Sequence, residues 1–468
     1  MNKEIKRIII ILTVLCMTFI SLIVYISYFQ IFKASAIKNN SYNKRLWINE
    51  QTILRGSILD RNGNVLAYSE KEGDSYKRNY NYGSLYSHIV GYSYREYGKS
   101  GLELYYNNSL LNISDSTPIN EIKNIVIPNT TGNNLVLTID HNIQSRARSL
   151  IDGKKGSIVV MNPTTGEIYA MVSYPDFNIS NLNENWKEIS EDMESPLINR
   201  AIQGLYAPGS VFKVITAMAA LENSSYETQY NCIGSEKIEG YVFKDYEGKA
   251  HGPIDLKGAL VKSCNTYFIN KSLEIGKDTI GKISERFFFN SRIPFDLPVK
   301  SSQFPYKEMT TDVEVAAASI GQGKVLVTPL NMALIASGIA NEGEVVKPIL
   351  VKEIVTKDGK VLKQSDIEIL SQGINPLGAN TIKDMMVEVV KSGTGVNAKI
   401  KNVTVAGKTG TAENSSGKNH AWFIGFAPAD NPKVAVSIVL EEDGSTGGKA
   451  AAPLARDIML YTIENIKD

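Results

Sequence analysis

The stretch of sequence that decides the fold is PGSVFKVITAMAALE, at residues 208–222. Pro208 and Gly209 precede Ser210, and Lys213 follows the serine by three positions. The run after them predicts a helix over 208–222. Residues three apart at a helix start lie on one face, within reach of each other. The helix N-terminus also offers free N–H groups and a partial positive charge. This arrangement suits a serine nucleophile that becomes an acyl ester.

Apolar runs on both sides of this helix predict strands. SIVVM at 157–161 is joined by NPTTG to a second apolar run at 167–173, a pattern typical of an antiparallel hairpin. Because strands lie at both ends with helices between them, we expect an α+β domain whose sheet joins early and late chain. Further strands are expected at 403–408, 421–426 and 433–440, and further helices at 329–340, 381–391 and 453–466. Thr328 is expected to cap the first of these helices, with Pro329 at its first position.

Composition narrows the class of protein. The 468 residues are 43% hydrophobic and 21% charged, which is enough to bury a sizeable core. The net charge of +1 argues against a nucleic-acid-binding protein held by bulk charge. Three cysteines make no disulfide framework, and Cys232 and Cys264 are expected to be free thiols. The four histidines show no metal-ligand spacing, which argues against a zinc hydrolase.

An uncharged apolar run at residues 8–29 predicts a membrane anchor. At about 1.5 Å per residue it reaches about 33 Å, enough to cross a bilayer. A cleaved signal peptide is the alternative, because Ala34-Ser35-Ala36 resembles a cleavage site. The run is too long for that, and Lys33 intervenes. Positive charges flank both ends almost equally, so they do not set the orientation.

The region between the anchor and residue 150 is polar and rich in short strand-like pieces. Within 57–69, the sequence DRNG at 60–63 lies between apolar pieces and predicts a hairpin turn. LVLTI at 135–139 predicts a strand, and Asp140 is expected to cap the helix that follows. We therefore divide the chain into an N-terminus (1–7), an anchor (8–29), a strand-rich pedestal (30–150) and a larger domain (151–468).

If the S-x-x-K pair acts as nucleophile and base, its lysine must be able to accept a proton. To accept the proton of Ser210, Lys213 must be neutral, and at an ordinary pKa only about one lysine in 2,500 is neutral at pH 7. Burial, the helix dipole and a second nearby lysine would all lower the pKa. The alternative is an ordinary capping serine beside a surface lysine, and for an isolated S-x-x-K that reading is the commoner one.

Two further short motifs follow. Ser263-Cys264-Asn265 offers a hydroxyl that can relay a proton and an amide that can bind a substrate carbonyl, although alone it is also typical of a turn. Cys264 is expected to be a buried small apolar residue. Lys408-Thr409-Gly410-Thr411 ends the strand-like run at 403–407, where a strand edge can bind an extended peptide. Gly410 would let the backbone approach substrate, while Lys408 and the threonines could hold a carboxylate.

Two alternative interpretations of motifs of this kind are rejected. AGKT at 406–409 resembles the end of a nucleotide-binding loop, but Asn402 stands where its first glycine should be. Lys391-Ser392-Gly393 follows the helical run, so Gly393 is expected to be a helix C-cap. Together and in this order, S-x-x-K, S-x-N and K-T-G are close to the motif set of serine β-lactamases and penicillin-binding proteins.

On these motifs the chain resembles the class B penicillin-binding proteins, which are monofunctional peptidoglycan transpeptidases. The resemblance covers most of the chain. It implies a β-lactamase-like α+β domain with an antiparallel sheet flanked by helices, preceded by a pedestal and one transmembrane helix. The stretches that carry it, besides the three motifs, are RGSILDRNG (55–63), GLE (101–103), residues 156–175, Arg200-Ala201, GQG (321–323), residues 408–413 and GGKAAAP (447–453), the last read as a loop before the final helix.

The resemblance also implies the chemistry. Ser210 would attack the bond between two D-alanines of a stem peptide, with Lys213 taking its proton. The N–H groups of Ser210 and Thr411 would form the oxyanion hole, and Ser263 would protonate the leaving amine. The residues expected to carry catalysis are Ser210, Lys213, Ser263 and Lys408; those expected to bind substrate are Asn265, Thr409, Gly410 and Thr411.

The resemblance implies the partners and the location as well. It implies acylation by β-lactams, no metal or organic cofactor, no nucleic acid, and a catalytic domain outside the cell membrane. The pedestal looks too short for a glycosyltransferase, which implies a separate polytopic membrane polymerase as partner. A D,D-carboxypeptidase or β-lactamase, a β-lactam sensor and an inactive scaffold remain alternatives, and the motifs leave division, elongation and sporulation open.

Overall fold

The computed structural model describes residues 3–29, 53–113, 130–223, 229–414 and 416–466. Helix α1 (Lys3–Tyr28) buries none of its residues, and an 18-residue window within it has a mean hydropathy of 2.8. Its length and composition suffice for one membrane span. The helix begins at Lys3, so it includes most of the segment that we expected to precede the span.

The centre of the larger domain is a five-stranded antiparallel sheet in the order β17-β18-β19-β7-β8. The central β19 pairs with β7 in a register that sets Val439 opposite Ser157, so late and early chain meet inside one sheet. This confirms the predicted α+β class. The strands are β7 (Gly156–Met161), β8 (Ile168–Tyr174), β17 (Ala406–Ala412), β18 (His420–Ala427) and β19 (Val434–Leu440).

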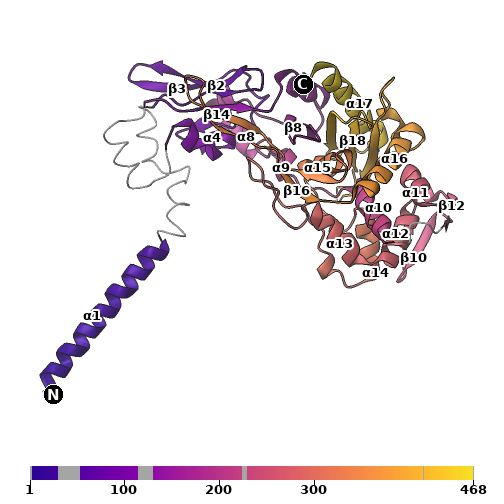
Figure 1. The fold of residues 1–468 in the computed structure, drawn as a ribbon, viewed down its shortest axis with the longest axis horizontal. Helices are drawn as coiled ribbons and strands as arrows, with labels where there is room; N and C mark the ends of the chain where they lie inside the picture. The colour runs from indigo at the N-terminus through magenta and orange to yellow at the C-terminus, as the bar shows by residue number, and fades with distance from the viewer. Residues whose placement is uncertain (1–2, 30–52, 114–129, 224–228, 415, 467–468) are drawn as a thin grey trace.

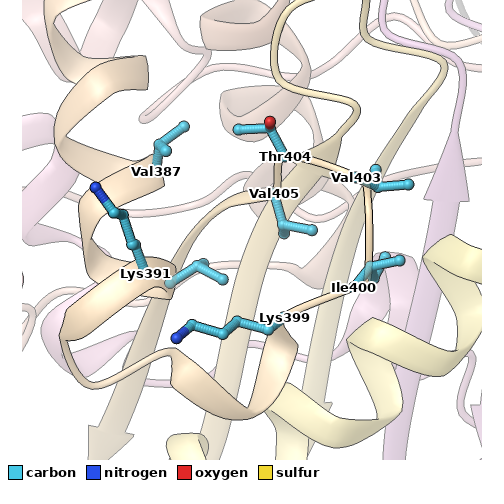
Figure 2. A pocket seen from close by; sticks show the side chains of 8 residues that line it. Val387, Lys391, Lys399, Ile400, Val403, Thr404 and Val405 are labelled. Carbon is cyan, nitrogen blue, oxygen red and sulfur yellow. The ribbon is translucent and has the colours of Figure 1, made fainter.

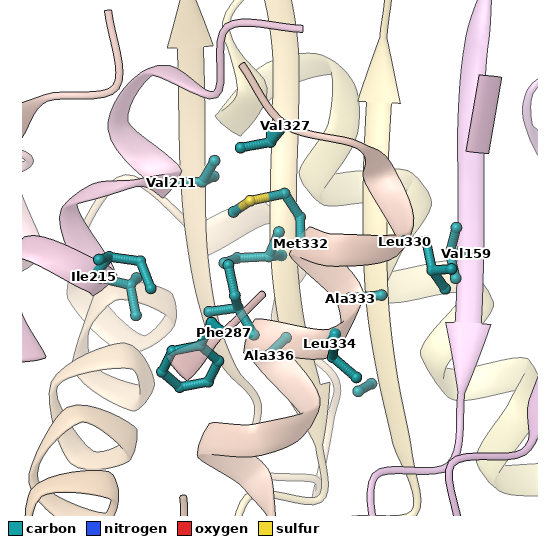
Figure 3. Close-up of a cluster of buried hydrophobic side chains, with 14 of the residues drawn as sticks. Val159, Val211, Ile215, Phe287, Val327, Leu330, Met332, Ala333, Leu334 and Ala336 are labelled. Carbon is teal, nitrogen blue, oxygen red and sulfur yellow. The ribbon is translucent and has the colours of Figure 1, made fainter. Parts of the chain in front are cut away.

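Helices cover both faces of this sheet because its strands alternate between two cores (Figure 1). In β7, Val159 packs toward one core and Ile158 toward the other. Helix α15 (Pro329–Ala340) fills the first core and is apolar almost all round, as Figure 3 shows. Helices α7 (His141–Leu150) and α17 (Gly447–Asn465) cover the opposite face. Thr328 caps α15 and Asp140 caps α7, as the sequence predicted.

A group of helices lies beyond the first core and carries the S-x-x-K and S-x-N motifs (Figure 1). Helix α10 (Lys213–Glu222) is buried over most of its length, and α12 and α13 pack against it. The helices around it are α11 (Leu256–Lys262), α12 (Asn265–Ile275), α13 (Lys277–Arg286), α14 (Asp312–Ser319) and α16 (Pro376–Ser392); the short strands beside them are β9 (Tyr230–Cys232), β10 (Ser235–Ile238), β11 (Tyr241–Lys244) and β12 (Gly252–Ile254).

A second sheet, of six strands, forms the pedestal in the order β15-β14-β6-β1-β2-β3. The predicted turn at 60–63 joins β1 to β2, and Asp60 accepts hydrogen bonds from the N–H groups of Asn62 and Asn64. Two strands come from far along the chain, so the boundary we predicted at residue 150 does not follow the sheet. The strands are β1 (Ile58–Leu59), β2 (Val65–Glu72), β3 (Ser75–Tyr80), β6 (Asn134–Leu137), β14 (Val351–Val355) and β15 (Val361–Gln364).

Three predicted boundaries were wrong. Strand β17 begins at Ala406, because residues 400–403 form a turn closed by the Ile400–Val403 bridge. Helix α16 begins at Pro376, where Asn375 caps it. Helix α17 begins at Gly447, so GGKAAAP is its first two turns and not a loop. The remaining elements are β4 (Ser93–Tyr94), β5 (Gly98–Lys99), α4 (Gly101–Tyr105), α5 (Asn107–Leu110), α8 (Leu182–Glu191), α9 (Arg200–Gln203), β13 (Glu344–Val346) and β16 (Ile369–Gln372).

Candidate active site

Ser210 lies on a short 3-10 turn, η3 (Gly209–Val211), and α10 starts three residues after the serine, at Lys213. The helix is therefore not continuous from Pro208 as predicted. Gly209 has a φ of +55°, and its N–H donates to the carbonyl of Gly321 at 2.9 Å. A Cβ at this glycine would lie 2.5 Å from the carbonyl oxygen of Thr411. The glycine thus lets the serine turn press directly against β17.

The amine of Lys213 is buried beside the S-x-N turn. Its Nζ donates to Asn265 Oδ1 at 2.6 Å and to the Ser263 carbonyl at 2.7 Å, and it lies 3.4 Å from Ser263 Oγ. The ring of Phe268 lies 5.6 Å from the same nitrogen. In the described part of the chain, Nζ hydrogen-bonds to Ser263 and Asn265 and not to the Ser210 hydroxyl. The lysine therefore connects the first motif to the second.

The amine of Lys408 reaches the same hydroxyl from the other side. Its Nζ donates to Ser263 Oγ at 2.9 Å and to the Thr409 carbonyl at 2.9 Å. Lys408 and Lys213 are both fully buried. Ser263 Oγ thus lies between two lysines from distant parts of the chain, and three predicted motifs meet at one point.

Burial shifts the acid–base behaviour of both lysines. It lowers the pKa of Lys213 to about 8, although Cys264 and Asp245 act in the opposite direction. Burial, joined by the charge of Lys213, holds the pKa of Lys408 well below its ordinary value. The physical cause is that a low-dielectric interior disfavours the charged form of an amine. A fraction of Lys213 is consequently neutral near pH 7 and can accept a proton.

The S-x-N turn has a backbone that fixes both polar side chains. Ser263 ends α11 in the left-handed conformation, with φ 56° and ψ 41°, and Asn265 is the first residue of α12. Asn265 Nδ2 donates to the Lys244 carbonyl at 2.8 Å, and the Asp245 carboxylate accepts from the Asn265 N–H. No sequence motif singles out Asp245, which lies 20 residues before Asn265.

The K-T-G-T motif lies inside β17, not at its end. Because side chains alternate along a strand, Lys408 and Thr409 point to opposite sides. Thr409 Oγ1 is 2.6 Å from Thr394 Oγ1, a hydroxyl that the sequence did not single out. Thr411 Oγ1 accepts from the N–H of Gly447 at 3.3 Å, at the start of α17. The threonines are thus tied to the neighbouring chain, while Lys408 faces Ser263.

Gly410 allows close packing inside the protein. A Cβ there would lie 2.8 Å from the Pro208 carbonyl, 3.0 Å from Val211 Cγ1 and 3.1 Å from Trp422 Cβ. Any larger residue would push the serine turn away from β17. The space next to this glycine is therefore filled by the chain itself, where the sequence had suggested an approach to substrate.

A cavity of about 210 Å³ lies elsewhere, where the chain leaves α16 and enters β17 (Figure 2). Valine and isoleucine side chains line it together with Lys391, Lys399 and Thr404. None of the predicted site residues lines this cavity. Nothing in its lining connects it to the chemistry of Ser210.

Comparison with known families matches most of the described globular part. Residues 156–460 match the model of the penicillin binding protein transpeptidase domain. Residues 55–135 match the model of the penicillin binding protein A dimerisation domain. The first range contains all the predicted site residues, and the second covers most of the pedestal before β6.

Individual relatives agree with these matches. The peptidoglycan D,D-transpeptidase PbpA of Mycolicibacterium smegmatis is 31% identical, over 97% of this chain and 98% of its own. The peptidoglycan D,D-transpeptidase MrdA of Acinetobacter baumannii is 30% identical, over 82% of this chain and 66% of its own. A solved imipenem acyl-enzyme complex of penicillin-binding protein A from M. tuberculosis is 30% identical, with a TM-score of 0.82 over 89% of this chain and 99% of that one.

Proposed function

The chain belongs to the family of penicillin-binding protein transpeptidases, and from this membership and the site geometry we propose how its residues perform the reaction. The protein is a serine-type peptidoglycan D,D-transpeptidase, an enzyme of cell-wall synthesis that β-lactams acylate. The assignment of residues rests on one observation. The amines of Lys213 and Lys408 both lie beside the Ser263 hydroxyl, and Ser210 lies on the turn that leads into Lys213.

Ser210 is the nucleophile and Lys213 its general base. A neutral amine keeps two N–H donors, which match the two short acceptors on Asn265 and Ser263, and leaves its lone pair for the Ser210 hydroxyl. Ser210 Oγ then attacks the carbonyl between two D-alanines of a stem peptide. The N–H groups of Ser210 and Thr411 bind the developing oxyanion, consistent with the tight contact between η3 and β17.

Breakdown of the tetrahedral intermediate needs a proton on the leaving D-alanine. Ser263 supplies it, because its hydroxyl touches both lysines and can pass on the proton that Lys213 took up. The Thr409 and Thr411 hydroxyls, which share one side of β17, exchange Thr394 and Gly447 for the terminal carboxylate, with Lys408 acting from the other side of the strand. Asn265 holds the stem amide. An amine of a second stem then attacks the Ser210 ester and forms the crosslink.

A direct test replaces the nucleophile. Ser210→Ala is expected to abolish covalent labelling by a fluorescent penicillin, measured on the full chain in detergent micelles. Ser392→Ala is the matched control, because this serine belongs to the rejected K-S-G motif and bonds only within α16. Persistent labelling of Ser210→Ala would rule out this nucleophile.

The reaction product separates a transpeptidase from a carboxypeptidase. With a stem-peptide substrate, we expect crosslinked dimers rather than hydrolysed stems.

We place the catalytic domain outside the cell membrane, with α1 as the one span among the residues that the structure describes. The substrate argues for this side, because peptidoglycan is crosslinked outside the membrane. Protease added to intact protoplasts is expected to remove the domain while α1 stays in the membrane. Survival of the domain would reverse the orientation.

We also propose a polytopic membrane glycosyltransferase as partner. The matches to known families assign residues 55–135 and 156–460 to other domains, and neither matched model is a glycan polymerase. Co-purification from crosslinked membranes is expected to recover such a polymerase, and its recovery is expected to fall when the pedestal residues before β6 are deleted.

A further inference from the structure

A small cavity lies in the pedestal, beside the residues through which the chain enters the six-stranded sheet. Its volume is about 110 Å³. Apart from Leu54, the described residues in its wall are polar, charged or glycine. The wall residues with hydrogen-bonding side chains that matter below are Ser57, Ser69, Thr131, Asn134 and Lys357.

Strand pairing in the sheet brings these side chains together. Ser57 precedes β1, and its N–H donates to Asn134 Oδ1 on β6 at 2.8 Å, while Ser69 belongs to the neighbouring strand β2. Asn134 is also paired with Val355, the last residue of β14. Lys357 lies two residues after Val355, in the turn between β14 and β15. Four strands of the sheet thus contribute to one small space.

Two glycines let the backbone of the wall pack directly against its neighbours. A Cβ at Gly56 would lie 1.9 Å from the Asn133 carbonyl oxygen, and one at Gly132 would lie 1.7 Å from the Leu110 carbonyl oxygen. The N–H of Gly56 donates to the Leu110 carbonyl at 2.8 Å, and the N–H of Gly132 donates to the Leu54 carbonyl at 2.7 Å. The shape of the wall is therefore fixed by the fold of the pedestal itself.

The wall offers hydrogen-bond donors that the protein does not use. Among the residues that the structure describes, none accepts a hydrogen bond from the Ser57 or Thr131 hydroxyl, from Asn134 Nδ2 or from Lys357 Nζ. The amide oxygen of Asn134 is already occupied by the Ser57 N–H. Two hydroxyls, one amide and one ammonium group are therefore available to a ligand that is rich in oxygen acceptors.

The charge behind this wall is unbalanced. Arg55 and Arg78 both bond the buried Glu103, at 2.5 and 2.7 Å, so two guanidinium groups share one carboxylate. Arg78 Nη1 reaches the wall, where it donates to the Gly56 carbonyl at 2.8 Å and lies 3.3 Å from Ser69 Oγ. Arg78 Nη2 is buried and has no hydrogen-bond partner in the described part of the chain. The cluster thus carries one net positive charge.

Lys357 adds a second positive charge at the edge of the cavity. Its side chain is exposed and forms no ion pair with any residue that the structure describes. A buried charge without a counter-ion is costly, because the protein interior solvates charge poorly. An anion in the cavity would lie next to Lys357 and to the wall that Arg78 reaches, so it would offset both charges.

We propose that the pedestal cavity is a binding site for a phosphate group, with Lys357, Ser57 and Asn134 as its ligands and Arg78 as the buried counter-charge. The donors belong to several strands, and a tetrahedral phosphate presents oxygens in as many directions, whereas a carboxylate presents two in one plane. Free phosphate and the headgroup of an anionic phospholipid share this chemistry. The site lies outside the transpeptidase machinery and does not rest on the proposed function.

Titration with inorganic phosphate tests the site directly. The phosphorus NMR signal of phosphate is expected to broaden when the full chain, in micelles of a phosphate-free detergent, is added, because bound phosphate tumbles slowly with the protein. Lys357→Gln is expected to weaken binding roughly tenfold, since a charge-assisted hydrogen bond is lost. Lys360→Gln is the matched control, because this exposed lysine belongs to the same turn and does not line the cavity.

Ser57→Ala tests the same site without changing its charge. Loss of one hydroxyl donor is expected to weaken phosphate binding several-fold, and the backbone N–H that bonds Asn134 is retained. If wild type, Lys357→Gln and Ser57→Ala all broaden the signal equally, phosphate binds elsewhere on the protein and a free-phosphate site in this cavity is refuted.

Lipid nanodiscs show whether the phosphate belongs to a headgroup. In buffer without free phosphate, a headgroup ligand predicts that the full chain unfolds about 2 °C higher in phosphatidylglycerol than in neutral phosphatidylcholine. Lys357→Gln is expected to abolish this difference and Lys360→Gln to keep it. A free-phosphate ligand instead predicts the NMR response in micelles with no lipid-dependent shift. Absence of the NMR response together with absence of a Lys357-dependent lipid shift would overturn the proposal.

Discussion

At the scale of single residues, Lys213 sets the pH dependence of acylation. Burial lowers its pKa to about 8, and only the neutral amine can accept the Ser210 proton. About one tenth is therefore neutral at pH 7 and nearly all at pH 9. The acylation rate constant is expected to rise about tenfold over this range and then level off, as measured with a fluorescent penicillin at fixed ionic strength.

The control for this prediction is Lys257→Gln, which removes an exposed lysine from α11 and should leave the profile unchanged. Lys213→Gln is expected to lose acylation at every pH, because no base replaces the amine. A wild-type rate that is flat between pH 7 and pH 9 would show that the neutral form of Lys213 does not limit the reaction.

At the scale of elements, the contact between the serine turn and β17 controls the geometry of the site. Gly410→Ala would place a methyl group 2.8 Å from the Pro208 carbonyl. Separation of η3 from β17 is expected to reduce acylation more than tenfold, because the oxyanion donors come from these two elements, and to cost about 1–3 kcal/mol of stability. Penicillin labelling and thermal unfolding of the full chain measure the two effects.

Gly153→Ala separates stability from acylation. This glycine has a φ of +70° in the turn after α7, with open space around it, so alanine is strained there without touching the site. It is expected to lower stability by about 1 kcal/mol and to leave the labelling rate unchanged. Equal losses of labelling in both glycine variants would mean that general destabilisation, not the η3–β17 contact, explains the Gly410 result.

At the scale of the whole molecule, a buried ion cluster holds the pedestal together. Glu103 is fully buried and accepts from Arg55 at 2.5 Å and from Arg78 at 2.7 Å. Burial alone would raise the pKa of Glu103, but the two arginines outweigh it and hold the pKa below its usual value. Because the folded state favours the carboxylate, this stabilisation is present above the ordinary glutamate pKa and is lost as the pH falls through the lowered one.

Glu103→Gln is accordingly expected to destabilise the full chain by about 3–5 kcal/mol at neutral pH, because two buried guanidinium groups lose their counter-charge. The difference in unfolding free energy between this variant and the wild type should shrink as the pH falls into the range where Glu103 itself is protonated. Thermal unfolding in detergent as a function of pH measures both. Glu70→Gln on the exposed face of β2 is the control, and a Glu103 variant as stable as this control would contradict the role of the cluster.

The sequence by itself determined the local elements and the identity of the chemistry. The turn at Asp60, the cap at Thr328 and the hairpin after Met161 depend on neighbouring residues, so local patterns predicted them. The three short motifs were individually weak, but their order along one chain was specific enough to indicate the family. One boundary failed where a distant contact decided it, at Gly447, whose N–H donates to Thr411 on β17.

Only the tertiary structure decided the features that need residues distant in sequence to come close together in space. Lys213 and Lys408 meet at Ser263 because three separate segments pack together, and their lowered pKa values follow from burial that no local pattern specifies. The role of Gly410 also follows only from the tertiary structure, because its lack of a side chain allows the Pro208 carbonyl to lie against it. The side chains of Cys232 and Cys264 depend on tertiary structure too, because their sulfur atoms lie within 4.8 Å of each other only when β9 and the start of α12 fold beside each other.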